Sequence, residues 1–141
     1  MSLVGLRFDD AMRDFRTLTA WQRSHAFALG VYKLTAPFPR EELYGVTSQM
    51  RRSAASVPTN IAEGCGSDGG LEMARFLQMA MRSATELDYQ LLLARDLGFI
   101  TGEAHQSLEN ELSAVKRILN ALIRKVRSDV RSQMARRKAN I

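Results

Sequence analysis

The segment from residue 49 to residue 64 constrains the fold most, because two stripes of different chemistry run along it at helical spacing. Residues three and four positions apart share one face of an α-helix. The apolar stripe consists of Val46, Met50, Ala54, Val57 and Ile61. The polar stripe beside it consists of Gln49, Ser53, Ser56, Asn60 and Glu63. A row of short polar groups next to an apolar face predicts a half-buried hydrogen-bond network between packed helices.

Pro58 lies inside this segment and alters its backbone. A proline removes one N–H donor and crowds the carbonyl four residues earlier, here that of Ala54, so we expect a kink at this turn. The freed backbone groups are expected to be served by Ser53, Ser56 or Asn60. A third helix runs beside this one in the predicted bundle, and the full set of network residues adds Arg52, Ser83 and Glu86.

The rest of the chain shows the same helical periodicity, and no alternating polar and apolar run predicts a strand. Apolar residues at helical spacing predict four helices, over residues 19–36, 40–63, 71–97 and 102–128. Short segments with proline or glycine separate them. Four long helices joined by short loops predict an all-α fold, an antiparallel four-helix bundle in up-down-up-down order.

The third and fourth helices have clear apolar faces. In the third, the predicted core residues are Phe76, Leu77, Ala80, Ala84, Leu87, Leu91 and Ala94. In the fourth, a heptad pattern comprises Leu108, Leu112, Val115, Leu119, Leu122 and Val126. The next two positions of this heptad are Asp129 and Gln133, so contact with the core is expected to end near Val126.

The first helix has two apolar faces, and only one of them is needed for the core of a monomeric bundle. One face, which we expect to be buried, consists of Trp21, His25, Ala28, Leu29 and Tyr32. The other face carries Phe27, Val31 and Leu34. Three apolar residues along one exposed ridge favour a contact between subunits, so these three are the candidate oligomer contact.

A chain of 141 residues fits one domain. We divide it into an N-terminal extension (1–14), the bundle (15–128) and a basic tail (129–141) that is partly helical or disordered. Within the first part, Phe8, Met12 and Phe15 have the spacing of a short helix. The single cysteine, Cys65, excludes an intrachain disulfide, and neither a signal peptide nor a membrane span is predicted, which favours the cytoplasm.

Positive charge is concentrated at the C-terminal end. The chain carries a net charge of +5. From residue 116 onward it contains nine Lys and Arg residues and only one acidic residue, Asp129. The nine are the candidate nucleic-acid-binding residues: Lys116, Arg117, Arg124, Lys125, Arg127, Arg131, Arg136, Arg137 and Lys138. Four of them recur every seven residues, at 117, 124, 131 and 138, and so form one ridge. Such a ridge is either a phosphate-contacting surface or an ordinary solvated face, and the sequence leaves both open.

The sequence argues against an enzyme. Metal-dependent bundle enzymes use Glu-x-x-His repeats, and neither His25 nor His105 has a glutamate three residues earlier. Cys65 has no neighbouring histidine to activate it. Glu63 and Glu86 are better explained as hydrogen-bonded carboxylates than as an acid pair. We therefore expect no catalytic residue, no metal and no cofactor.

Several landmarks together resemble one known family. Residues 49–64 are similar to the signature of the four-helix-bundle proteins of bacterial ribosomal RNA intervening sequences, also called the S23 ribosomal protein family. Further matching landmarks are Phe15-x-x-Leu18-x-x-Trp21-Gln22, Phe38-Pro39-x-Glu41-Glu42-x-Tyr44-Gly45 and Ser83-Ala84-x-Glu86-Leu87. The resemblance implies a left-handed bundle that assembles as a homopentamer. It also implies kinship with the accessory variability protein of diversity-generating retroelements, which partners a reverse transcriptase and binds nucleic acid.

Two functions follow from these patterns. The first is a non-enzymatic bacterial oligomer that binds RNA or DNA through its basic fourth helix and tail. The alternative is a protein-interaction scaffold, or accessory subunit, that docks a partner such as a reverse transcriptase. Neither RNA nor DNA is favoured by the sequence, and no membrane partner is expected.

Overall fold

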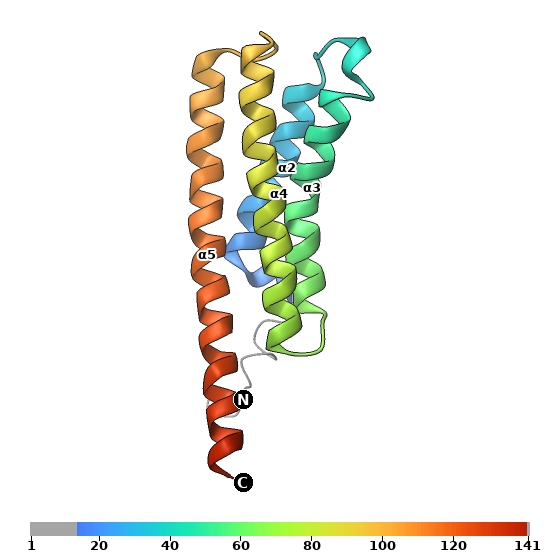
Figure 1. Cartoon of the computed structure of the whole chain (residues 1–141). Coiled ribbons are helices and arrows are strands. Elements are labelled where there is room, and N and C mark those ends of the chain that lie inside the picture. The colour runs from blue at the N-terminus through green and yellow to red at the C-terminus, as the bar shows by residue number, and fades with distance from the viewer. Residues whose placement is uncertain (1–13, 141) are drawn as a thin grey trace.

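The structure is a computed structural model, which describes residues 14–140 and shows a bundle of helices (Figure 1). The four long helices are α2 (Thr19–Thr35), α3 (Val46–Cys65), α4 (Gly70–Asp96) and α5 (Gly102–Ala139). Two short 3₁₀ helices, η2 (Phe15–Thr17) and η3 (Arg40–Glu42), precede α2 and α3. Residues 14–140 contain no strand, so the predicted all-α fold class is confirmed for this part.

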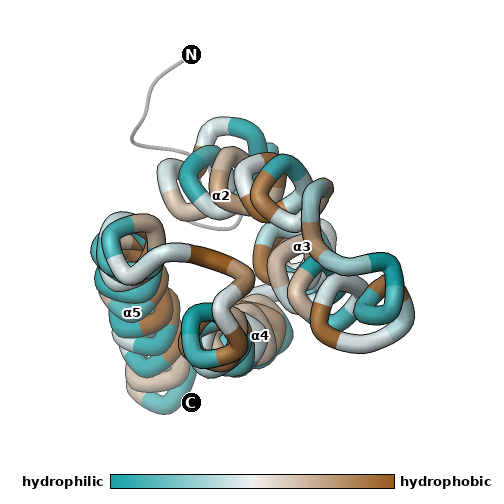
Figure 2. The backbone as a smooth tube through the Cα atoms, turned by 90° about the horizontal axis from the view of Figure 1, so that it is seen from above, coloured by the Kyte–Doolittle hydropathy of each residue, from teal (hydrophilic) through white to brown (hydrophobic). Residues whose placement is uncertain are grey.

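The helices pack in a ring around one core. Helix α3 lies between α2 and α4, and α5 contacts both α4 and α2 (Figure 2). The predicted core faces of α3 and α4 are buried except for the half-buried Phe76, and Met50, Ile61, Leu77, Leu87 and Leu91 are among the largest fully buried side chains. Burying one such side chain contributes about 1.5–3 kcal/mol. The apolar stripes therefore explain why these helices associate.

Helix α2 turns a different face to the core from the one the sequence predicted, although Ala28 of the predicted face is buried, at 6% exposure. Val31 is 0% exposed and Phe27 is 7% exposed, whereas Leu29 and Tyr32 are 52% and 47% exposed. Leu34 is partly buried against the same core. The prediction that Phe27, Val31 and Leu34 form an exposed oligomer contact is therefore wrong, because these side chains fill the core of their own chain.

Two hydroxyl residues explain why this face of α2 was misassigned. Ser24 and Thr35 lie in the buried stripe beside Phe27 and Val31, so the face that is buried is less uniformly apolar than a core face usually is. Within the helix, Ser24 Oγ donates to the carbonyl of Trp21 at 3.1 Å, and Thr35 Oγ1 donates to the carbonyl of Val31 at 2.8 Å. A hydroxyl satisfied by its own helix can be buried at little cost.

Helix α3 begins at Val46, six residues later than the predicted start at residue 40. Residues 40–42 form η3 instead, and Glu42 Oε2 accepts a hydrogen bond from the Val46 backbone N–H at 3.3 Å. A Cβ atom at Gly45 would lie 2.7 Å from that same oxygen. The absence of a side chain at Gly45 thus leaves room for the Glu42 carboxylate to reach forward to the first N–H of α3.

From Val46 to Cys65, α3 is a continuous helix that includes the buried Pro58. The kink at Pro58 stays a prediction. Near the proline, Thr59 Oγ1 donates to the carbonyl of Ala55 at 2.7 Å, and Asn60 Nδ2 donates to that of Ser56 at 2.9 Å. Pro58 has no N–H to donate to the carbonyl of Ala54. The side chains of Thr59 and Asn60 donate instead to the next two carbonyls, those of Ala55 and Ser56.

Helix α5 is much longer than the core requires. Val126 is its last buried residue, where the heptad places the end of core contact, yet the helix continues to Ala139. Val130 makes a further contact, since a Cβ atom at Gly70 of α4 would lie 2.5 Å from Val130 Cγ2. Every residue from 131 to 140 is exposed. Figure 1 shows this segment extending past the end of the other helices.

Two sequence expectations fall wholly or partly outside the described residues. The N-terminal extension (1–14) is described only at Asp14, and of the predicted short helix only Phe15 is described, within η2. In the part of the chain that is described, no helix is both long and apolar enough to cross a bilayer.

Candidate nucleic-acid interface

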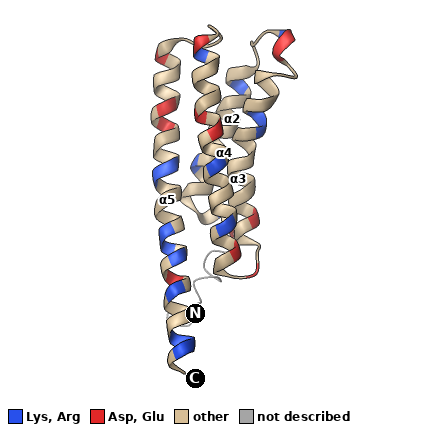
Figure 3. Ribbon diagram, viewed as in Figure 1, with Lys and Arg blue, Asp and Glu red and all other residues tan. Residues whose placement is uncertain are grey.

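The charge of α5 is divided between its two ends. Its first ten residues carry Glu103, Glu109 and Glu111, and from residue 116 onward Lys and Arg predominate. Figure 3 shows Lys and Arg gathered along the part of α5 that approaches and passes the end of the bundle. The basic half of this helix is therefore the candidate surface for a polyanionic partner.

Four basic residues form the ridge predicted from the sequence. Arg117, Arg124, Arg131 and Lys138 are all exposed, and no ion pair or hydrogen bond occupies any of their side chains within residues 14–140. A rise of about 1.5 Å per residue separates neighbouring members by about 10 Å along the helix. The ridge thus presents a row of four cations toward solvent.

Two of the other predicted contact residues are engaged with α4. Lys116 Nζ lies 3.0 Å from Asp88 Oδ2, and the Lys116 side chain is only 23% exposed. Arg127 Nη2 donates to Gln78 Oε1 at 3.2 Å. Lys116 therefore serves the α4–α5 contact rather than the basic surface. The remaining predicted residues, Lys125, Arg136 and Arg137, are exposed.

The predicted polar network is present in a smaller form. Ser56 Oγ of α3 and Ser83 Oγ of α4 share a hydrogen bond of 2.8 Å. Asn60 Nδ2 donates to Ser56 Oγ at 3.0 Å as well as to the Ser56 carbonyl. Asn60 is 9% exposed, so the cluster lies in the interface of the two helices. We call Ser56, Asn60 and Ser83 the hydroxyl–amide cluster.

The long polar residues of the predicted network lie outside this cluster. Gln49, Arg52, Glu63 and Glu86 are exposed, and the described residues show no hydrogen bond from any of them to the hydroxyl–amide cluster. Glu86 Oε1 instead accepts from Gln90 Nε2, at 3.5 Å. Ser53 is buried. Long charged side chains reach solvent from the edge of a helix interface, whereas short ones stay inside it, so the network was predicted too large.

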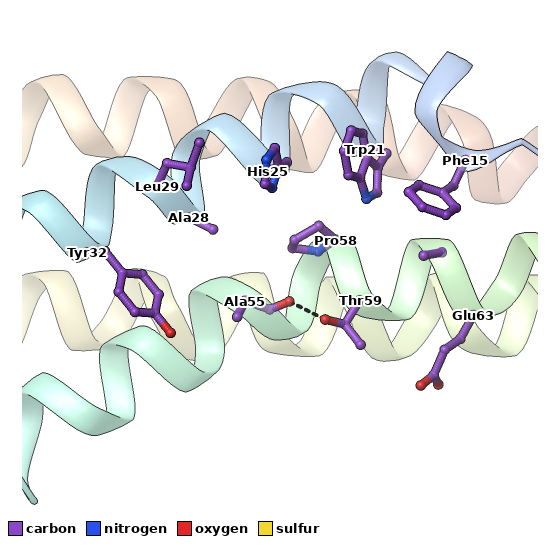
Figure 4. Close-up of a pocket in the computed structure, with 11 residues that line it drawn as sticks. Phe15, Trp21, His25, Ala28, Leu29, Tyr32, Ala55, Pro58, Thr59 and Glu63 are labelled. Carbon is purple, nitrogen blue, oxygen red and sulfur yellow. Dashed lines mark hydrogen bonds between the residues drawn. The ribbon is translucent and has the colours of Figure 1, made fainter.

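An apolar groove runs between α2 and α3, with a volume of about 440 Å³. Its walls come from the exposed stripe of α2 and the turn of α3 around Pro58. Figure 4 shows Trp21, His25 and Tyr32 of α2 on one side and Pro58 and Thr59 of α3 on the other. The face of α2 expected to be core thus lines an open groove.

Aromatic contacts organise one end of this groove. The rings of Trp21 and His25 stack at 4.8 Å, and Phe15 packs against Trp21 at 5.0 Å. These ring contacts form an aromatic wall at this end of the groove. An exposed stripe of this kind marks an interaction surface more often than a random surface does.

The groups that would serve catalysis are dispersed or inactivated. Within residues 14–140 no three His, Cys, Asp or Glu side chains are close enough to hold a metal ion. His105 is buried, with Nδ1 4.0 Å from Glu109 Oε2, and His25 belongs to the aromatic wall. Burial, and to a smaller extent the Asp14 carboxylate, raises the pKa of the Cys65 thiol to about 11. A thiol with that pKa is a poor nucleophile near neutral pH.

The fold and these surfaces can now be compared with known proteins. Residues 16–121 match the model of one family, described as 23S rRNA-intervening sequence protein. The chain belongs to this family. The recognition made from the motifs around Asn60 and Ser83 is therefore confirmed.

A solved structure shares the fold. A crystal structure from Bacteroides thetaiotaomicron, of a protein with unknown function from the S23 ribosomal protein family, superposes with a TM-score of 0.67 at 24% identity. The match covers 74% of this chain and 98% of that one. No curated protein sequence matches this chain.

The limits of the family match divide the candidate surfaces. The hydroxyl–amide cluster and the apolar groove lie almost wholly within residues 16–121, and so does Arg117. Arg124 and all later basic residues lie beyond it. The exposed basic end of α5 is thus a feature of this chain that the intervening-sequence family model does not include.

Sequence reasoning missed a second hollow, of about 430 Å³, at the start of α3. Tyr32, Tyr44, Arg51 and Arg52 are among its lining residues. Arg51 Nε donates to Thr35 Oγ1 at 2.8 Å, and its guanidinium lies 5.0 Å from the centre of the Tyr32 ring. Tyr44 is 92% exposed. The sequence signal for this hollow was Tyr44, an aromatic residue between Pro39 and Gly45, in a segment where a continuous helix was expected.

Proposed function

We propose that this chain is a non-enzymatic nucleic-acid-binding protein whose contact surface is the basic half of α5. The observation that carries the proposal is the ridge of Arg117, Arg124, Arg131 and Lys138, exposed and without partners in residues 14–140. Exposed cations in a row attract the phosphates of a polyanion and release its counterions. Contacts of this kind carry little sequence information, so binding is weakly sequence-specific.

The dispersed histidines and the raised pKa of Cys65 support the non-enzymatic part of the proposal. The intervening-sequence family supports a bacterial protein, and the proposed location is the cytoplasm. The ribosomal label of the S23 family is not taken as a function. RNA and DNA both present the phosphates that the ridge requires.

The test is a salt titration of nucleic-acid affinity with charge-reversed protein. The variant Arg117→Glu/Arg124→Glu/Arg131→Glu is expected to bind at least tenfold more weakly, with a log–log salt slope lower by about 2–3. The matched control, Arg23→Glu/Arg40→Glu/Arg82→Glu, reverses three exposed arginines on or beside other helices and is expected to lose much less. Unchanged affinity and slope in the α5 variant would remove the ridge as the contact.

We also propose that the chain acts as an oligomer, a homopentamer of left-handed, antiparallel up-down-up-down bundles. Contacts between consecutive helices across short connections support the up-down order. The apolar groove, lined by Leu29 and Tyr32, supports a self-contact, because large apolar side chains at the surface favour association. The groove takes the place of Phe27, Val31 and Leu34 as the proposed contact between copies.

The second candidate function is a scaffold or accessory subunit that docks a protein partner, such as a reverse transcriptase. The same apolar groove favours it, because aromatic residues are enriched in protein interfaces. Light scattering separates the two uses of the groove. A protein that is monomeric alone leaves the groove to a different polypeptide, whereas an oligomer that dissociates when the groove is altered assigns the groove to a second copy.

A further inference from the structure

We propose that the projecting end of α5, residues 131–139, binds duplex DNA by lying in its major groove. This inference rests on the proposed function and narrows it from nucleic acid in general to one class. The segment is helical, and all of its residues are exposed. It contains four of the basic residues, Arg131, Arg136, Arg137 and Lys138, and no acidic one.

The projection is long enough and free enough to enter a groove. Val130, which lies against Gly70 of α4, is the last residue of α5 that is not exposed, and α5 continues to Ala139. Nine residues of helix extend about 14 Å, which is two and a half turns. A helix that extends past its own bundle can approach a duplex without a clash from the other helices, and Figure 3 shows Lys and Arg positions on the part of α5 beyond the bundle end.

The shape of the helix favours DNA over duplex RNA. An α-helix with its side chains is about 10–12 Å across, and the major groove of B-form DNA is about 12 Å wide. The major groove of A-form RNA is deep and too narrow for side chains to read. The other side chains of the segment are short or uncharged, namely Ser132, Gln133, Met134, Ala135 and Ala139.

The placement of charge around the helix favours a groove over a flat surface. Arg136, Arg137 and Lys138 are consecutive, and successive residues of a helix point about 100° apart. Arg136 and Lys138 therefore point to nearly opposite sides, about 160° apart. In a groove, phosphates flank a helix on both sides, so cations on two sides can both be neutralised. A helix that only rests on a surface uses one face.

The composition of α5 argues against single strands. Proteins that bind single-stranded nucleic acid combine a positive groove with aromatic side chains on which bases stack. Helix α5 contains no Phe, Tyr or Trp from Gly102 to Ala139. Among residues 14–140, the exposed tyrosines are Tyr32 on α2, Tyr44 just before α3 and Tyr89 on α4. The projection thus offers contacts to phosphates but no aromatic side chains on which bases could stack. This combination suits a duplex better than a single strand.

The experiment compares three probes of one sequence, about 20 nucleotides long: duplex DNA, duplex RNA and single-stranded DNA. Fluorescence anisotropy with the full chain measures each affinity between about 50 and 200 mM salt. We expect duplex DNA to bind at least tenfold more tightly than either other probe. The variant Arg131→Gln/Arg136→Gln/Arg137→Gln/Lys138→Gln is expected to lose this preference, with a salt slope lower by up to about 3.6 on duplex DNA.

A matched control removes the same charge elsewhere. Arg23→Gln/Lys33→Gln/Arg40→Gln/Arg82→Gln changes four exposed residues outside α5 and is expected to keep the preference for duplex DNA. Circular dichroism of both variants checks that the helices persist, which is expected because neither set of residues is buried.

The outcomes separate this inference from the proposed function. Equal or tighter binding of either other probe by the unmodified chain overturns the DNA assignment while leaving a nucleic-acid-binding protein. A preference that survives in the α5 variant overturns the role of the projection. If none of the three probes binds at the lowest salt, the proposed function fails, and the inference fails with it.

Discussion

At the scale of single residues, the α3–α4 interface depends on short polar side chains that satisfy one another. A hydrogen bond between Ser56 and Ser83 joins the two helices, and the Asn60 amide donates hydrogen bonds to both the hydroxyl and the carbonyl of Ser56. If one partner were removed, the other would be left in the interface with an unsatisfied hydrogen-bonding group. The free-energy cost of such a group is larger than the net contribution of the hydrogen bond to stability. The cluster therefore specifies how α3 and α4 lie against each other.

We expect Asn60→Ala to lower the free energy of unfolding by about 1–3 kcal/mol, because two acceptors on Ser56 lose their donor. Chemical denaturation followed by circular dichroism measures this change. The matched control is Glu63→Ala on the same helix, which is expected to be nearly neutral because Glu63 is exposed and outside the cluster. Equal losses in the two variants would show that the cluster has no special role.

At the scale of elements, the junction of α4 and α5 decides where the projection begins. Gly70 lies in the first turn of α4, and Val130 of α5 approaches it so closely that a side chain has no room there. This contact lies just beyond the last buried residue of α5, Val126. Beyond this point the residues of α5 are exposed, and within residues 14–140 no hydrogen bond or ion pair joins them to another helix.

We expect Gly70→Ala to destabilise the protein by about 1–3 kcal/mol, because the new methyl group overlaps the Val130 side chain. The double variant Gly70→Ala/Val130→Ala is expected to recover most of this loss, since the methyl group then has space. Urea denaturation of the single and double variants measures both effects.

Gly102→Ala serves as the control for this pair. Gly102 is also in the first turn of a long helix, but no atom lies within 4 Å of the position of its Cβ. Its substitution is expected to be neutral or slightly stabilising. If Gly70→Ala behaved in the same way, the end of α5 would have to bend away from α4 at no cost, and the contact would not anchor the projection.

At the scale of the whole molecule, two surfaces on different sides of the bundle serve different partners in our proposal. The basic half of α5 meets nucleic acid, and the apolar groove between α2 and α3 meets a second copy. Because α2 and α3 lie on one side of the ring and the α5 ridge faces solvent, one molecule can use both surfaces together (Figure 2). Assembly would then multiply the number of basic projections that contact one polyanion.

We expect Leu29→Glu to reduce assembly without unfolding the chain, because Leu29 is 52% exposed in the groove and a charge there opposes burial against a second copy. Multi-angle light scattering measures the mass, and circular dichroism measures the helix content. The control Leu71→Glu changes an equally apolar residue, 63% exposed at the start of α4, and is expected to keep the mass of the unmodified protein.

A chain that is monomeric before any substitution would contradict the oligomer proposal. An oligomer that persists in Leu29→Glu would place the self-contact outside the groove. Loss of mass in both variants would point to a general effect of added charge.

Much of this fold was open to prediction because helical periodicity is a local property. Spacings of three and four residues identify the buried stripes of α3 and α4, and the heptad ends at Val126, beyond which residues 131–140 are all exposed. The motifs around Asn60 and Ser83 were enough to recognise the family. Each of these features depends on residues close together in the chain.

Tertiary structure alone decided the rest. Helix α2 has two apolar faces of similar strength, and only the positions of α3 and α5 determine that Phe27 and Val31 are buried and that Leu29 and Tyr32 line a groove. Glu63 has the spacing of a network residue, but its length carries it to solvent. The sequence by itself determined the helices and the basic ridge, and packing determined which sides of those helices are left for partners, because burial depends on neighbours that are distant in the chain.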